Sequence, residues 1–284
     1  MLPTPSTTHV PYTRVYEPSE DSFLLLDTLS APSETAFLAS HFPSSSPSTN
    51  TITTSSPLLL EIGPGSGVVL AFLTAHAQHI FGRQDVLALG VDVNWHACAA
   101  TGETVRKAVG ESSSSSSSPE ERDGGGGGGS GSGCFLGAVQ GDLTGAVRPG
   151  TVDVLVFNPP YVPTDEVPSL LGKEGEEAGG KTTFEEDSRL LALAYAGGRD
   201  GMEITERVIA ALPGVLSARG VAYLLLCAGN KPEEVKARIR GMEGGEWRAE
   251  TVGTSGKQAG WEKLQIVRIW REEEERREGE GLGY

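Results

Sequence analysis

The chain has 284 residues, 38% of them hydrophobic, which is enough for a sizeable core and excludes a wholly disordered protein. Its formal net charge is −15, from 23 Lys+Arg and 38 Asp+Glu, and this acidic balance argues against tight unaided binding to a nucleic acid. The three cysteines have no metal-ligand spacing, so neither a disulfide framework nor a bound metal is expected. No apolar run approaches the roughly 20 residues that cross a bilayer, so we expect no membrane association and a location in the cytoplasm, or also in the nucleus.

The N-terminal part of the chain has two sections. Residues 1–15 are expected to be a flexible N-terminus. Residues 19–29 predict a helix, with Ser19 as a plausible cap, acids in the first turn and leucines along one side. This helix lies outside the repeating pattern described next, so it is free to cover a ligand site.

From residue 58 onward, short apolar runs alternate with helix-like segments. The runs that predict strands are residues 58–62, 86–93, 134–139, 152–157 and 221–227. The segments that predict helices are residues 68–80, 95–109, 188–196, 202–212 and 231–240, and residues 247–252 and 264–270 predict a closing antiparallel pair. Apolar strands alternating with helices indicate an α/β fold, with a mostly parallel sheet covered by helices on both faces.

Three stretches are rich in Ser, Gly or Glu and poor in large apolar side chains, so we expect disordered insertions near residues 40–57, 111–133 and 172–181. The pattern continues on both sides of each stretch. The sequence therefore predicts a single domain over residues 16–270 with these insertions, followed by a charged tail over residues 271–284.

Polar residues follow the first three predicted strands, at the edge where parallel sheets bind ligands. Residues 61–67 form a glycine-rich turn that begins with Glu61 and leads into a helix; it lacks the pattern of a phosphate-binding loop and is also consistent with tight packing alone. Asp92 is suited to accept both hydroxyls of a ribose, although an acid here is also a common helix cap. Asp142 is suited to accept an amino group of a purine, or it is simply a turn residue. Together the three indicate a nucleoside site.

The fourth predicted strand ends in the sequence Asn158-Pro159-Pro160-Tyr161. Two successive prolines hold the backbone rigid and extended, so that the Asn158 side-chain oxygen and the Pro159 carbonyl face the same way. Two fixed acceptors suit a planar NH2 group, and the Tyr161 ring offers a face on which a flat amide or base can stack. A loop merely bounded by prolines is the plainer interpretation, but the flanking Asn and Tyr favour an amino-group site.

These motifs resemble class I S-adenosylmethionine-dependent methyltransferases with an NPPY motif, and more closely the eukaryotic HemK-type release-factor glutamine methyltransferases. The residues that carry the resemblance are 16–27, 61–69, 92, 141–143, 153–162, 196–201 and 257–260. The NPPY motif alone is shared with adenine methyltransferases, whereas its combination with residues 16–21 (YEPSED) and 196–201 (AGGRDG) is much more specific.

The resemblance implies a Rossmann-like fold with a seven-stranded sheet and S-adenosylmethionine as the cofactor. Its cofactor contacts fall on Ser22, Glu61, Gly63, Gly65, Asp92, Asp142, Leu143 and Asn158. Its contacts with the substrate amide fall on Asn158, Pro159, Pro160 and Tyr161, of which Asn158, Pro159 and Tyr161 are the expected catalytic residues. It also implies two partners, a class I translation release factor as substrate and a small zinc-binding activator subunit that forms a heterodimer through an apolar surface near the third strand.

The predicted reaction is methylation of the side-chain amide nitrogen of a glutamine. No histidine, cysteine or lysine lies near the NPPY motif in sequence, so catalysis is expected to rest on positioning. Three alternatives remain open at this point. They are adenine-N6 methylation of DNA or RNA, lysine methylation of a protein, and a nucleotide-binding module without turnover.

Overall fold

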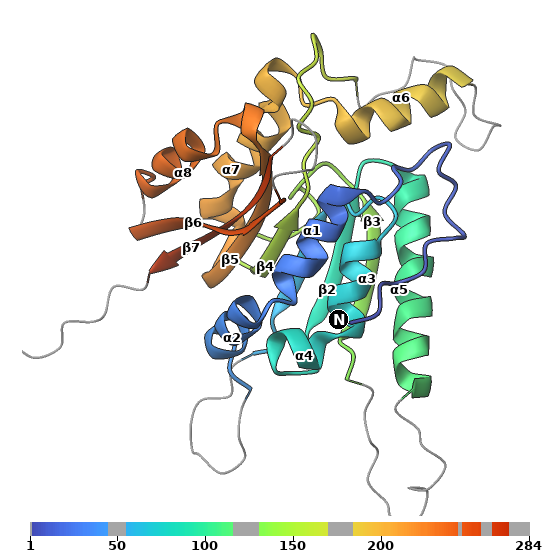
Figure 1. The fold of residues 1–284 in the computed structure, drawn as a ribbon, viewed down its shortest axis with the longest axis vertical. Coiled ribbons are helices and arrows are strands. Elements are labelled where there is room, and N and C mark those ends of the chain that lie inside the picture. The colour runs from blue at the N-terminus through green and yellow to red at the C-terminus, as the bar shows by residue number, and fades with distance from the viewer. Residues whose placement is uncertain are drawn as a thin grey trace, which may run out of the picture.

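The centre of the fold is a seven-stranded sheet with the strand order β3-β2-β1-β4-β5-β7-β6 (Figure 1). The structure is a computed structural model that describes residues 2–44, 55–115, 131–169, 184–243, 246–256 and 263–272. The strands are β1 (Leu58–Ile62), β2 (Leu87–Asp92), β3 (Cys134–Gln140), β4 (Val152–Phe157), β5 (Leu216–Cys227), β6 (Glu246–Thr254) and β7 (Leu264–Glu272).

Helices connect the strands and precede the first one. They are α1 (Glu20–Leu29), α2 (Pro32–His41), α3 (Val68–Ala75), α4 (Ala77–Phe81), α5 (Trp95–Ser115), α6 (Phe184–Tyr195), α7 (Glu203–Val215) and α8 (Pro232–Arg240), with the 3-10 turns η1 (Arg199–Gly201) and η2 (Ala228–Asn230). None of the helices within the described ranges is long and apolar enough to cross a membrane.

The predicted sheet is confirmed. Strands β1 to β5 pair in parallel, and β7 runs antiparallel to both β5 and β6. Successive side chains of the central strands enter opposite cores: Val154 and Val156 of β4 belong to one, Leu155 and Phe157 to the other. This burial on both faces explains why the central strands read as continuous apolar runs. The sheet is therefore the mostly parallel Rossmann-like sheet expected from the sequence.

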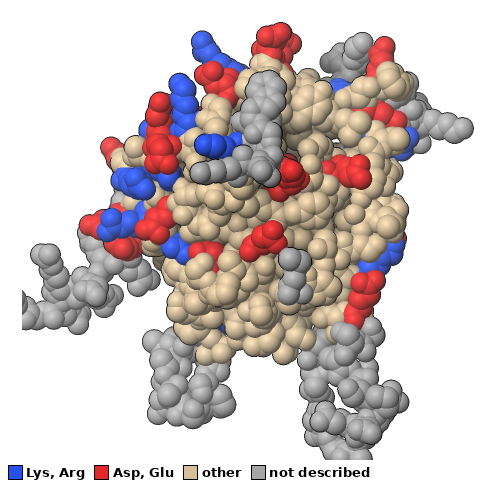
Figure 2. Space-filling view, viewed as in Figure 1, with Lys and Arg blue, Asp and Glu red and all other residues tan. Residues whose placement is uncertain are grey.

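Each face of the sheet has its own layer of helices. The first core takes apolar side chains from α1 to α5, and the second takes them from α7 and α8. Helix α6 lies across the end of the sheet at which the parallel strands terminate (Figure 1). On the face drawn in Figure 2, Lys and Arg side chains are interspersed with Asp and Glu and form no continuous basic patch.

The N-terminal segment, expected from the sequence to be flexible over residues 1–15, packs against α5 in the part that the structure describes. Val10 and Val15 are buried against Ala97 and Ala100 of α5, and the Asn94 side-chain amide donates a hydrogen bond of 2.7 Å to the carbonyl of Arg14. The segment is ordered because its few apolar side chains occur where α5 presents small ones. The N-terminal segment thereby reaches the ends of the strands.

Some residues of the expected insertions belong to helices or contacts that the structure describes. Residues 40 and 41 complete α2, and Phe42 is fully buried in the first core. Helix α5 continues to Ser115, and the Gly133 N–H donates to the Thr74 carbonyl at 2.7 Å. Residues 45–54, 116–130 and 170–183 lie outside the described residues, and so do residues 273–284 of the expected tail.

A buried polar cluster fastens α2 to the sheet. Arg268 of β7 donates to both carboxylate oxygens of Glu34, at 3.0 and 3.1 Å, and the Tyr223 hydroxyl of β5 donates to the same carboxylate at 2.9 Å. The guanidinium also lies 3.8 Å from the centroid of the Phe37 ring. Glu34 and Tyr223 are almost fully buried. Water therefore cannot replace the hydrogen bonds that are lost when one member of the cluster is removed.

We predict that Glu34→Ala lowers the free energy of unfolding by about 3 kcal/mol. It leaves the Tyr223 hydroxyl buried without its acceptor, and Arg268 loses its buried partner and keeps the exposed one, Glu250 at 3.2 Å. Urea denaturation measures the change. The control is Glu103→Ala, which removes an exposed partner of Lys107 on α5 and should leave the unfolding free energy unchanged. Equal effects of the two variants would show that the cluster does not stabilise the fold.

Candidate active site

The strand order changes direction at β1, which has β2 on one side and β4 on the other. Such a reversal leaves a crevice at the carboxyl ends of the strands. A cavity of about 200 Å³ occupies this place. It is lined by the ends of β1, β2 and β4, the loop after β3, the start of α1, part of α6 and the N-terminal segment. All the cofactor and substrate residues predicted from the sequence line this one cavity.

The glycine-rich turn combines the two roles considered for it. Gly67, with φ 79°, lies so close to α5 that a Cβ atom would be 2.6 Å from the Thr101 Cα, so this glycine serves packing. Gly63 and Gly65 also have positive φ, 63° and 54°, but no atom lies within 4 Å of the place where their Cβ would be. The turn therefore holds its left-handed conformation beside open space, which leaves room for a ligand close to the backbone.

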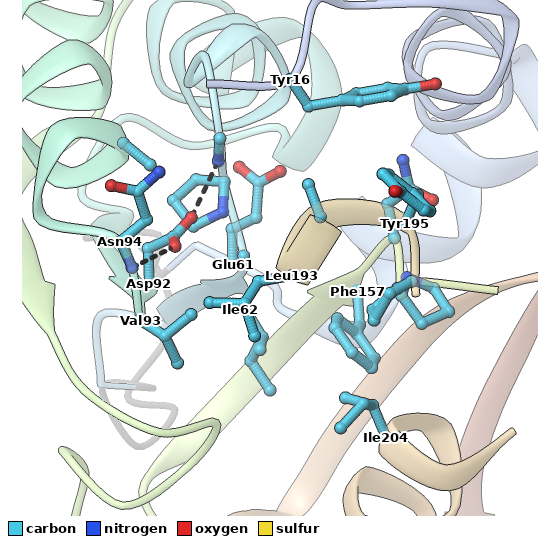
Figure 3. A pocket seen from close by; sticks show the side chains of 18 of the residues that line it. Tyr16, Glu61, Ile62, Asp92, Val93, Asn94, Phe157, Leu193, Tyr195 and Ile204 are labelled. Carbon is cyan, nitrogen blue, oxygen red and sulfur yellow. Dashed lines mark hydrogen bonds between the residues drawn. The ribbon is translucent and has the colours of Figure 1, made fainter. Parts of the chain in front are cut away.

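Two carboxyl groups line the floor of the cavity. Asp92 accepts hydrogen bonds from the Gly65 N–H at 3.1 Å and the Asn94 N–H at 2.8 Å, so it joins the glycine turn to the end of β2 (Figure 3). Burial raises the pKa of Asp92 to about 6, against these two hydrogen bonds, which lower it. Burial also raises the pKa of Glu61 to about 8, with a smaller contribution from Asp92.

The buried Oε2 atom of Glu61 has no hydrogen-bond partner among the described residues. In Figure 3 the Glu61 carboxyl points toward the side of the cavity where the Tyr16 ring lies. A buried carboxyl oxygen without a donor is costly unless a ligand supplies one. With a pKa of about 8, Glu61 is mainly protonated at neutral pH and can pair with a cationic or hydrogen-bonding ligand.

The loop after β3 holds Asp142 and Leu143 at the rim of the cavity. The Asp142 carbonyl accepts from the Gly145 N–H at 3.0 Å, as a turn residue does, while its carboxylate pairs with Arg207 of α7 at 2.5 Å. Leu143 has φ 51°, a left-handed conformation that costs roughly 1–3 kcal/mol for a residue other than glycine. A carboxylate beside a backbone N–H in a strained loop is suited to the hydrogen-bonding edge of a base.

The NPPY motif forms the wall opposite the second and third strand ends. The Asn158 side-chain oxygen is buried and accepts no hydrogen bond from the described part of the chain. The Tyr161 hydroxyl donates to Asp21 Oδ2 of α1 at 3.5 Å, and Ser22 beside it lines the cavity. A buried amide oxygen left without a donor costs about 1–3 kcal/mol, so its retention at a cavity wall indicates a ligand that supplies the donor.

Several lining residues were not anticipated from the sequence. Arg14 of the N-terminal segment pairs with Asp187 of α6 at 2.9 Å, which joins two segments that border the cavity. Leu193 and Tyr195 of α6 also line the cavity, and Tyr195 lies on the side where β4 ends at Phe157 (Figure 3). These contacts join residues far apart in the chain and have no local sequence signal. The motif at residues 257–260 lies outside the described residues.

We predict that the ligand-free protein loses unfolding free energy between about pH 5 and pH 8, and that Glu61→Gln reduces this loss. Folding raises the pKa of Glu61 from 4.5 to about 8, so its contribution to stability is complete below pH 4.5 and is lost as the pH rises through about 8. Urea denaturation across this range checks the slope. The slope should not vanish in the variant, because the raised pKa of Asp92 acts in the same direction; equal slopes in both proteins would contradict the assignment.

The chain is similar to known methyltransferases. No family model matches the chain. The chain is 33% identical over 279 residues to Methyltransferase HEMK2 of Mus musculus, which covers 94% of this chain and 96% of that protein. It is 30% identical over 277 residues to the eRF1 methyltransferase catalytic subunit mtq2 of Schizosaccharomyces pombe, covering 95% and 96%. It is 26% identical over 261 residues to the putative protein N5-glutamine methyltransferase MJ0928 of Methanocaldococcus jannaschii, covering 90% and 92%. The chain belongs to the HEMK2 family of methyltransferases.

Proposed function

We propose that the protein methylates the side-chain amide nitrogen of a glutamine in a class I translation release factor, with S-adenosylmethionine as the methyl donor. The observation that carries the proposal is the buried Asn158 oxygen, which lines the cavity and has no donor among the described residues. The names of the relatives support it, since one is called an eRF1 methyltransferase and another a putative protein N5-glutamine methyltransferase. The proposal implies a cytoplasmic protein, because translation termination takes place there.

The lining residues fit S-adenosylmethionine. Asp92 has carboxylate lone pairs left for ribose hydroxyls, and Asp142 with the Leu143 N–H offers an acceptor and a donor for the base. The Glu61 carboxyl, whose Oε2 atom has no hydrogen-bond partner among the described residues, suits a positively charged ligand. Ile62, Phe157 and Ile204 give the cavity apolar walls. The cofactor supplies a methyl group activated by the adjacent sulfonium charge.

The NPPY motif orients the substrate. The Asn158 oxygen and the Pro159 carbonyl accept the two N–H bonds of the glutamine amide, and the Tyr161 ring packs against its plane. An amide nitrogen is a weak nucleophile, so alignment has to supply most of the rate, and well-aligned groups can contribute about 7–11 kcal/mol. The same two oxygens stabilise positive charge that develops on the nitrogen as it gains the methyl group, and the nitrogen then gives up one proton to the solvent.

The direct test is transfer of label from S-adenosylmethionine to a purified class I release factor, with double-stranded DNA and a lysine-containing peptide as alternative acceptors. Label on a release-factor glutamine and none on DNA is the expected result. Label on adenine alone would replace the proposal by nucleic-acid methylation, and label on lysine alone by lysine methylation. Absence of transfer to every acceptor would favour a binding module.

We predict that Asn158→Ala abolishes turnover while cofactor affinity stays within a few-fold, because the substituted side chain holds the acceptor amide. Turnover is measured with labelled cofactor and affinity by calorimetry. Arg148→Ala, at an exposed position outside the cavity, is the control and should retain both. Loss of cofactor binding in Asn158→Ala would contradict the assignment of Asn158 to the substrate site.

We further propose that the small zinc-binding activator binds along β3. This strand lies at one edge of the sheet, and its Leu136 and Val139 side chains are 54% and 40% exposed. An exposed edge strand offers unpaired backbone groups to a partner strand. The word subunit in the name of the Schizosaccharomyces pombe relative supports an assembly with another chain.

We predict that Leu136→Asp abolishes binding of the activator and its stimulation of methyl transfer, because a charge would replace an apolar contact at the edge. Calorimetry and the labelling assay with and without the activator measure the two effects. Thr254→Asp, on the strand at the opposite edge of the sheet, is the matched control. Unchanged binding by Leu136→Asp would place the activator elsewhere.

A further inference from the structure

A buried asparagine outside the cavity joins three parts of the chain behind the NPPY motif. Asn230 ends the turn η2 that follows β5, and it is only 4% exposed. Its Oδ1 accepts from the Cys227 N–H at 2.9 Å. Its Nδ2 faces three carbonyl oxygens, those of Asp200 at 3.2 Å, Gly201 at 3.4 Å and Tyr161 at 3.5 Å. One side chain thus connects the end of the sheet to the last residue of the motif.

Two glycines of the loop at residues 196–201 lie directly against the backbone of the motif. A Cβ atom on Gly201 would be 2.0 Å from the Tyr161 carbonyl oxygen, and one on Gly197 would be 2.4 Å from the Pro160 carbonyl oxygen. The loop is also hydrogen-bonded just beyond the motif, since the Gly197 N–H donates to the Val162 carbonyl at 2.8 Å. The glycines allow backbone to touch backbone at this joint.

The backbone of the NPPY motif contributes little to fixing its own orientation. Beside it, the Tyr161 hydroxyl donates to Asp21 at 3.5 Å and the Val162 N–H donates to the Tyr195 carbonyl at 3.0 Å. The prolines of the motif have no N–H groups with which to form a ladder. The motif must therefore be held from behind by the 196–201 loop and by donors such as Asn230 Nδ2. Substrate and cofactor groups approach it from the cavity side, which Asn230 does not line.

We propose that Asn230 is a positioning residue for methyl transfer: through the Tyr161 carbonyl and the 200–201 backbone it sets the orientation in which the motif presents the acceptor amide. This inference rests on the proposed function. Asn230 touches neither substrate nor cofactor. A displacement of about 1 Å at reacting groups costs on the order of 100-fold in rate, so a loosened joint should lower kcat without weakening cofactor binding.

The test uses Asn230→Asp in the full chain. Aspartate keeps the acceptor for the Cys227 N–H but replaces the Nδ2 donor by an oxygen that faces three carbonyl oxygens. We expect kcat toward the release factor to fall by about 10-fold to 100-fold, with the cofactor Kd within about 3-fold of wild type. Protonation of the new carboxyl restores one donor, so the ratio of variant to wild-type kcat should rise as the pH is lowered.

Two further variants separate positioning from a general loss of stability. Tyr223→Phe removes a buried hydroxyl contact on the same strand β5 but outside the cavity, and it should keep the wild-type kcat. Gly201→Ala forces the Tyr161 carbonyl to move and should lower kcat as Asn230→Asp does, which covers the case in which the aspartate variant does not fold. A wild-type kcat in a folded Asn230 or Gly201 variant, or an equal loss in Tyr223→Phe, would overturn the proposal.

Amide hydrogen exchange tests the role of Asn230 without any methyl acceptor. In Asn230→Asp, exchange should quicken in residues 158–164 and 196–203 and stay unchanged in β1 and β2. If wild-type protein labels no release factor, the proposed substrate fails, whereas the exchange pattern still decides whether Asn230 holds the motif. Unchanged exchange in both segments would refute the inference.

Discussion

The site depends on one topological constraint, the reversal of strand order at β1. Parallel strands release their chains at the same edge, and the reversal sends the connections after β1 and β4 to opposite faces of the sheet. The register pairs Ile62 with Phe157, so the glycine turn and the NPPY motif begin side by side. The carboxyls of β1 and β2 and the amide of Asn158 converge only because this crevice stays open between them.

Close backbone contact is the second organising feature. The glycine turn touches α5 at Gly67, and the 196–201 loop touches the NPPY motif at Gly197 and Gly201. In both places a side chain would push apart segments whose separation sets the width of the cavity. The prolines keep the NPPY motif rigid, and the glycines of the 196–201 loop allow its backbone to contact that motif closely.

The sequence was informative where residues act through local chemistry. Apolar runs predicted all seven strands because the central ones are buried on both faces, and the polar residues after them were found together because strand ends share one edge. The pairing of Asp142 with Arg207 and of Arg14 with Asp187 joins residues whose separation in the chain carries no pattern. For the same reason α2 and the packing of the N-terminal segment were missed, and α6 was predicted as a helix but not as a wall of the cavity. Each of these features depends on tertiary contacts.

The two buried carboxyls of the cavity, Glu61 and Asp92, couple ligand binding to the release of protons. With a pKa of about 8, Glu61 is mainly protonated at neutral pH, and Asp92, with a pKa of about 6, is only partly so. A positive charge placed beside them favours their ionised forms. A cationic ligand that occupies this cavity therefore releases protons to the solvent, and its measured binding heat will depend on the ionisation enthalpy of the buffer.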